Sequence, residues 1–234
     1  EQGTDPVLSM AASALADAYV RMGARPTFTC APYQLEGAPA EGENIAWAES
    51  NAVVYANSVL GARTMKYPDF LDICIALTGR APEAGCHLDE NRKAGLVVEV
   101  EAMEGRDDSF WPLLGYRIGR LAPNVIPAVT GLEQAQPTAD DLKAFGAAFA
   151  TTSAAPMFHI VGVTPEAPTL SAATGGKAPD VLSVTGGDLA DDWHHFNATT
   201  GEAIDLVALG NPHFSFDECE ALAHLCSGRA KHAG

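Results

Sequence analysis

The feature that most constrains this chain is a repeated alternation of short apolar segments with longer segments that have helical spacing and capping residues. Parallel strands require a crossover between them, usually a helix, so this order predicts a largely parallel sheet covered by helices. We therefore expect an α/β fold with parallel or mixed sheets. The expected strands are 25–29, 96–103, 124–129, 157–161, 181–185 and 205–209, and the expected helices are 8–22, 42–63, 67–77, 111–121, 138–150, 188–194 and 216–226.

The segment 42–63, GENIAWAESNAVVYANSVLGAR, has an unusual composition for a surface helix. Polar residues such as Glu49, Ser50 and Asn57 are interleaved with apolar ones almost all round the expected helix. Some of them should be buried, where an unpaired polar group costs about 1–3 kcal/mol. Two interpretations stay open: the wall of a substrate site, or a core helix of small residues whose polar groups are paired within the protein.

Charge and cysteine content limit the classes of partner. The formal net charge is -16, the pI is about 4.6, and no apolar run is long enough to span a membrane. Nucleic acid and anionic membranes are therefore not expected as partners, because both require basic patches. A small anionic substrate is still compatible with a local arginine. The five cysteines are odd in number and scattered, which favours a reducing cytoplasm over a disulfide framework.

Three polar loops, at 29–34, 159–166 and 210–215, each follow an expected strand. Because the carboxyl ends of parallel strands meet at one edge of a sheet, we expect these loops to converge. Thiolate, imidazole and carboxylate groups together there would suit an iron or zinc site. Each residue alone is a weak signal, since a lone cysteine is usually a small core group. The residues concerned are Cys30, His159, Thr164, Glu166, Asn211, His213 and Ser215.

Five segments resemble the large catalytic domain of the aconitase X family: CAPYQ, GENIAWAESNAVVYANSVLGART, GRAPEAGCHLDENR, HIVGVTPEAPT and LGNPHFS. They occur in the expected order and cover nearly the whole chain. The resemblance implies an aconitase-superfamily-like catalytic domain of an iron–sulfur dehydratase. One type in the family is a single chain that acts on cis-3-hydroxy-L-proline. Another is split into large and small subunits and acts on mevalonate 5-phosphate.

Carried over by position, Cys30 matches the first cluster cysteine of the family, and His213 lies near it in the second motif. Asn211 stands where many members have cysteine, in a GCPH motif, and this departure fits the hydroxyproline type with its smaller [2Fe-2S] cluster. A further family cysteine and the swivelling domain would fall beyond Gly234. We therefore expect residues 1–234 to be a partial catalytic domain, partnered by the rest of the same enzyme as a swivelling domain or small subunit.

The activity that the resemblance implies is loss of water from cis-3-hydroxy-L-proline to give pyrroline-2-carboxylate. A base would remove the α-proton, and iron would act as a Lewis acid on the carboxylate or the leaving hydroxyl. The candidate catalytic residues are His87, Glu166 and Ser58, and a serine beyond this chain is a further candidate base. The candidate substrate contacts are Glu49, Ser50, Asn57, Arg63, Thr64 and Thr164, with Arg63 clamping the carboxylate.

Two alternatives lead to different expectations. A mevalonate 5-phosphate dehydratase should carry more basic residues for its phosphate, and this chain has only 14 Lys and Arg. A non-catalytic binding or subunit-interface module should hold no iron. In such a module, Cys30→Ala would affect packing alone.

Overall fold

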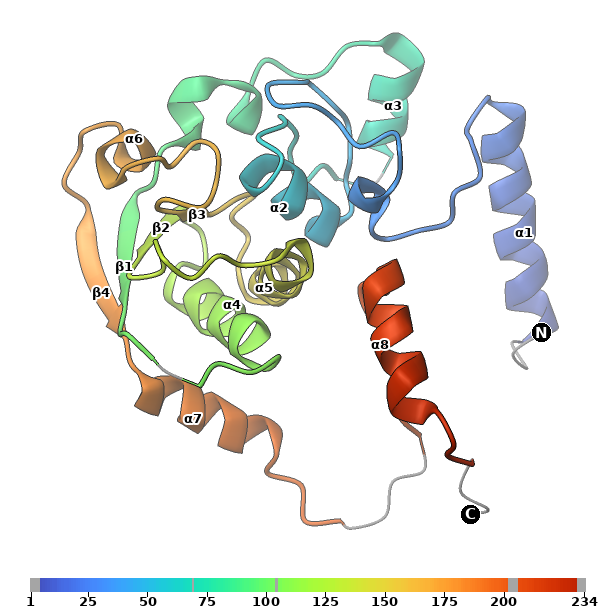
Figure 1. The fold of residues 1–234 in the computed structure, drawn as a ribbon. Helices are drawn as coiled ribbons and strands as arrows, with labels where there is room; N and C mark the ends of the chain where they lie inside the picture. The colour runs from blue at the N-terminus through green and yellow to red at the C-terminus, as the bar shows by residue number, and fades with distance from the viewer. Residues whose placement is uncertain (1–4, 69, 104, 202–205, 231–234) are drawn as a thin grey trace.

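The computed structural model describes residues 5–68, 70–103, 105–201 and 206–230 (Figure 1). Its sheet has four strands in the order β3-β2-β1-β4. These are β1 (Leu96–Val100), β2 (Pro127–Thr130), β3 (His159–Ile160) and β4 (Asp180–Val184), and every pairing is parallel. The predicted α/β architecture is therefore confirmed. β1 lies between β2 and β4, and only Glu99 on it is exposed.

Eight α-helices and three short 3-10 helices are described. The α-helices are α1 (Pro6–Arg21), α2 (Ser50–Ser58), α3 (Leu71–Thr78), α4 (Phe110–Leu121), α5 (Ala139–Thr152), α6 (Leu170–Thr174), α7 (Gly186–Phe196) and α8 (Phe216–Cys226). The 3-10 helices are η1 (Pro32–Gln34), η2 (Gly85–His87) and η3 (Asp89–Arg92). Among the described residues, no helix is both long and apolar enough to cross a bilayer.

The core lies where α2, α4 and α5 pack together beside the sheet (Figure 1). Phe145 and Phe149 of α5 meet Phe158 edge to face, with ring centroids 4.6 and 5.7 Å away. Gly115 makes the close approach of α4 to α5 possible, because a Cβ at this position would lie 2.2 Å from the carbonyl oxygen of Phe145. A glycine inside a helix lowers its intrinsic stability, and this close packing explains why one stands at position 115.

Helix α2 is much shorter than the predicted helix at 42–63. It begins after Glu49, whose carboxylate caps its first turn, and ends at Ser58. Gly61 then adopts a positive φ of 69°. A parallel bridge between Asn44 and Arg63 joins the extended flanks of the helix. Asn51 through Ser58 are all buried, so the polar side chains of this helix are interior groups, as the composition predicted.

Two predicted strands do not form. Residues 25–29 are irregular, because Pro26 has no N–H to donate and Phe28 adopts a positive φ of 44°. Residues 206–209 are also irregular and have no partner strand among the described residues, and Leu206 is 81% exposed. Asp205, the first residue of that predicted strand, lies outside the described residues.

The helices near the two ends of the chain, α1 and α8, stand apart from the sheet (Figure 1). Both match their predicted ranges to within two residues, yet neither contains a buried residue. Their apolar side chains are largely exposed, for example Met10 at 73% and Phe216 at 83%. Apolar packing therefore does not fix the positions of these two helices. Polar contacts therefore matter for placing α8.

Candidate functional site

Helix α2 carries a polar group of residues at each end. At its first turn, Glu49 accepts hydrogen bonds from the backbone N–H of Asn51 at 3.2 Å and of Ala52 at 2.8 Å. The side-chain amide of Asn51 donates to the carbonyl oxygen of Cys30 at 2.7 Å and accepts from the hydroxyl of Tyr33 at 2.9 Å. Burial raises the pKa of Tyr33, so this phenol stays protonated and donates. The backbone of Cys30 is thereby tied to the start of α2.

The thiol of Cys30 lies against the loop that precedes α8. The backbone N–H of His213 donates to Cys30 Sγ at 3.2 Å, and His213 Nδ1 lies 3.3 Å from Thr29 Oγ1. Cys30 is half-buried, whereas Asn211 and His213 are exposed. An N–H aimed at sulfur is an arrangement that suits a thiolate, free or bound to metal.

A cavity of about 490 Å³ opens beside this contact. It lies between the start of α2, one face of α5 and the loop before α8, and its size is within the usual range for small-molecule sites. We call it the Cys30 cavity. Its polar lining residues are Cys30, Glu49, Ser50, Asn51, Thr151, Lys143, Asn211 and Glu218. Two predicted substrate contacts, Glu49 and Ser50, thus line the same cavity as the predicted metal ligand.

The donor set at this cavity does not complete an iron–sulfur site. Across the described ranges of the chain, no group of three or more His, Cys, Asp or Glu side chains is arranged to hold a metal ion. All five cysteines are free, and Cys86 is buried elsewhere, in η2. Cys30 therefore fits one ligand position of a cluster and no more.

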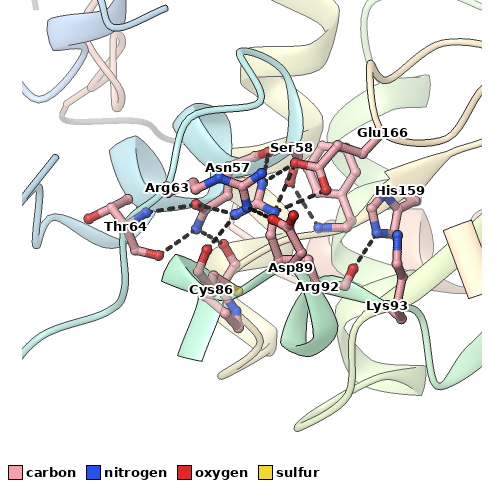
Figure 2. Close-up of polar contacts among 12 residues, drawn as sticks. Asn57, Ser58, Arg63, Thr64, Cys86, Asp89, Arg92, Lys93, His159 and Glu166 are labelled. Atoms are coloured by element: carbon pink, nitrogen blue, oxygen red, sulfur yellow. Dashed lines mark hydrogen bonds and ion pairs between the residues drawn. The ribbon is translucent and has the colours of Figure 1, made fainter. Parts of the chain in front are cut away.

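The opposite end of α2 is organised by Arg92, which we did not single out from the sequence. This guanidinium is fully buried. Figure 2 shows it among Asn57, Cys86 and Glu166. Its Nε donates to both carboxylate oxygens of Glu166, at 2.8 and 3.0 Å. The terminal nitrogens donate to Asn57 Oδ1 at 3.2 Å, to the Asn57 carbonyl at 3.0 Å and to the Cys86 carbonyl at 2.9 Å. One sequence signal could have pointed to Arg92. The polar side chains expected to be buried on the helix in 42–63 need a hydrogen-bond donor that is itself buried.

Most predicted residues at this end already bond to protein. Asn57 donates to the carbonyls of Thr64 and Pro156 and accepts from Thr64 N–H at 3.0 Å. Ser58 Oγ accepts from the N–H of Phe158 at 2.9 Å. Thr64 donates to a backbone carbonyl, and the hydroxyl of Thr164 closes the turn after β3. In this structure these side chains serve the fold, and their contacts with a substrate stay predictions.

His87 is partly exposed and has both ring nitrogens occupied. Nδ1 lies 2.8 Å from Asn44 Oδ1, and Nε2 is hydrogen-bonded to the hydroxyl of Tyr67. Burial, followed by the charges of Arg92 and Arg63, lowers the pKa of His87. The imidazole is therefore neutral at pH 7 and accepts the phenol proton in its hydrogen bond.

Arg63 and His159 complete this region (Figure 2). Arg63 pairs with the exposed carboxylate of Asp89 at 2.7 Å, so its predicted partner, a substrate carboxylate, would have to replace that ion pair. His159 is 1% exposed and donates from Nε2 to the carbonyl of Arg92 at 2.7 Å. Burial lowers the pKa of His159, which keeps this core imidazole neutral.

The three predicted loops do not form one site. Cys30 and His213 meet at the first turn of α2, but Glu166 and His159 lie with Arg92 at its last turn. Asn51 and Asn57 are six positions apart, which is about 9 Å along the helix. The expectation was wrong because only the loop at 159–166 follows a strand of the sheet. Ser215 instead caps α8.

Comparison with known proteins agrees with this architecture. The model described as the aconitase X first domain matches residues 1–90, and the model of the aconitase X second domain matches 94–194. The chain superposes on the crystal structure of Thermococcus kodakaraensis aconitase X in its holo-form with a TM-score of 0.85 and 32% identity, covering 95% of this chain and 55% of that one.

Relatives of known name extend the similarity along the sequence. A Pseudomonas aeruginosa protein named cis-3-hydroxy-L-proline dehydratase is 58% identical over 99% of this chain. A phosphomevalonate dehydratase large subunit from Methanothermobacter thermautotrophicus is 41% identical over 89% of it. The chain spans 40% of the first relative's length and 50% of the second's. Two consecutive domain models and a shared fold lead to one conclusion: this chain belongs to the aconitase X family.

Proposed function

We propose that the protein containing this chain is an iron–sulfur-dependent dehydratase that converts cis-3-hydroxy-L-proline to pyrroline-2-carboxylate. The observation that carries the proposal is the 58% identity to the Pseudomonas aeruginosa protein of that name, which extends over 99% of the chain. The identity to the phosphomevalonate dehydratase large subunit is lower, at 41%. The shortage of basic residues for a phosphate supports the same choice.

We place the substrate in the Cys30 cavity. Its volume of about 490 Å³ admits a cyclic amino acid, and the carboxylate of Glu49 and the exposed hydroxyl of Ser50 lie on its wall. A carboxylate there would accept a hydrogen bond from the protonated ring nitrogen, and the serine hydroxyl would bond to a substrate oxygen. Glu49 also caps α2, so its orientation is fixed before a substrate arrives.

Cys30 is the residue of this chain that we propose as a cluster ligand. When bound, the cluster, which we take to be [2Fe-2S], would supply a Lewis-acidic iron to an oxygen of the substrate. His213 would donate its N–H to the ligating sulfur, and the exposed Asn211 would lie beside it without a thiolate. Residues 1–234 would then be part of one catalytic domain. The remaining ligands would come from the rest of the enzyme, either a swivelling domain or a small subunit.

The candidate bases of this chain, His87, Glu166 and Ser58, do not line the Cys30 cavity. The carboxylate of Glu166 is held by the guanidinium of Arg92, and Ser58 is buried with its oxygen bonded to the backbone. His87 is partly exposed and its imidazole is neutral, but its Nε2 already accepts a hydrogen bond from the hydroxyl of Tyr67. With the substrate in the Cys30 cavity, the base would therefore come from the rest of the enzyme, such as the serine beyond this chain that the resemblance implies. Arg63 does not line this cavity either, so its role as partner of the substrate carboxylate would require the substrate to bind near the last turn of α2, in exchange for Asp89.

The test uses the intact protein, purified without oxygen, with cis-3-hydroxy-L-proline and mevalonate 5-phosphate as parallel substrates. Mass spectrometry would detect loss of water from each. We expect dehydration of the hydroxyproline alone. Dehydration of the phosphate substrate alone would refute the proposed substrate, and an intact protein that binds no iron and dehydrates neither compound would support a non-catalytic module.

A further inference from the structure

We propose that Lys143 is a positioning residue that holds the loop 210–215 over the thiol of Cys30. Lys143 lies on α5 and was not among the residues expected to matter. The inference deepens the proposed function and rests on it in one respect, which is that the Cys30 cavity is the catalytic site. The geometric claim itself concerns only how this loop is held in place.

Lys143 joins α5 to the loop and to α8. Its side chain is 3% exposed, and its ammonium lies 2.9 Å from Asp140 Oδ1 and is hydrogen-bonded to the carboxylate of Glu218 on α8. The ammonium also lies 3.4 Å from the carbonyl oxygen of His213. A buried ammonium is stable only with such partners, so the three contacts are mutually dependent.

The position of α8 depends on these polar contacts because apolar packing does not fix it. No residue of α8 is buried, and Phe216 and Leu225 are 83% and 69% exposed. A second contact also joins α5 to the start of α8: Ser215 Oγ lies 2.6 Å from Asp140 Oδ2. Asp140 and Lys143 of α5 therefore bind the N-cap residue Ser215 and the first turn of α8 through a hydrogen bond and an ion pair.

The link to Cys30 runs through one residue. His213 accepts from Lys143 with its carbonyl oxygen and donates to Cys30 Sγ with its backbone N–H. Fixing this residue from the α5 side therefore fixes the N–H that faces the sulfur. Replacing Lys143 by methionine would leave the carboxylates of Asp140 and Glu218 facing each other without a cation, which favours release of the loop.

The test measures the reactivity of the Cys30 thiol in the intact protein after removal of bound metal with a chelator and reduction. Iodoacetamide labelling, resolved by peptide mass spectrometry, gives a rate for each cysteine. We expect Lys143→Met to label Cys30 about tenfold faster than wild type, because an anchor of charged hydrogen bonds is lost. Lys143→Arg should restore most of the protection. Lys177→Met is the matched control, because Lys177 is exposed and its ammonium forms no hydrogen bond or ion pair with the described residues.

Buried Cys86 reports on folding within the same experiment, because it should stay protected from iodoacetamide in any variant whose core remains folded. If Lys143→Met exposes Cys86, Glu218→Gln decides the question, because it removes only the carboxylate of α8 that pairs with Lys143 and changes no residue of α5. A Cys30 rate within about twofold of the control in the variant that keeps Cys86 protected would overturn the inference.

Turnover separates this inference from the proposed function. An active wild type with unchanged Cys30 labelling in the variants refutes the positioning role alone. An inactive wild type whose variants label Cys30 faster retains the positioning role and refutes the proposed substrate.

Discussion

Replacing Arg92 by methionine tests the account of how α2 is held. The change keeps most of the aliphatic stem and deletes a guanidinium that is fully buried. The carbonyl oxygens of Asn57 and Cys86 lose their donor, at about 1–3 kcal/mol each. Glu166 loses its partner but is 19% exposed, so water recovers part of that loss. The sum agrees with the cost of about 3–5 kcal/mol for breaking a buried ion pair.

Native-state hydrogen exchange of the α2 amides in the intact protein measures this cost locally, as the free energy of opening. We expect it to fall by about 3–5 kcal/mol in Arg92→Met. Lys93→Met is the matched control, because Lys93 is exposed and the one hydrogen bond of its ammonium among the described residues is to the carbonyl of Ala172, at 3.3 Å. The control should change the opening free energy by less than about 0.5 kcal/mol. A loss below about 1 kcal/mol in Arg92→Met would refute the argument that this residue organises α2.

Two further predictions follow from burial and packing. Because burial lowers the pKa of His87 below the unfolded value of about 6.5, its contribution to stability is present above that pH and is lost as pH falls through the folded pKa. The thermal midpoint should therefore drop less between about pH 7 and pH 5 in His87→Gln than in wild type, and an equal drop would contradict the assignment. Gly115→Ala forces a Cβ against α5 and should cost about 1–3 kcal/mol by thermal denaturation. Gly187→Ala, where a Cβ meets nothing closer than 3.6 Å, should cost less, and the reverse order would be inconsistent with the packing of α4 on α5.

Helices were predictable where their ends are set locally. Thr138 and Ser215 each form a capping box with the residue three positions on, and α5 and α8 begin directly after them, as expected. Strands depend on partners elsewhere in the chain, and local composition cannot supply those. This is why 25–29 and 206–209 have strand-like composition but remain irregular.

In the candidate site, too, features set by the local sequence were predictable, and those that depend on distant partners were not. Cys30 was named from its place in a polar loop after an expected strand, and the resemblance to the family then gave it a specific role as a cluster ligand. Arg92 and Lys143 were missed because their roles depend on acceptors far along the chain: Glu166 lies 74 residues from Arg92, and Glu218 lies 75 residues from Lys143. The polar composition of 42–63 did predict buried polar groups. The structure then showed that most of them pair with protein, while the first turn of α2 lines a cavity.

The central claim, that Cys30 belongs to the catalytic site of an iron-dependent dehydratase, has a direct test. Turnover of cis-3-hydroxy-L-proline and bound iron would be measured together in the anaerobically purified intact protein, in Cys30→Ser and in Cys74→Ser. Cys74 is exposed on α3 and does not line the Cys30 cavity, so its variant controls for loss of a thiol. We predict that Cys30→Ser loses both turnover and iron while Cys74→Ser keeps both. Wild-type turnover and iron content in Cys30→Ser would contradict the account.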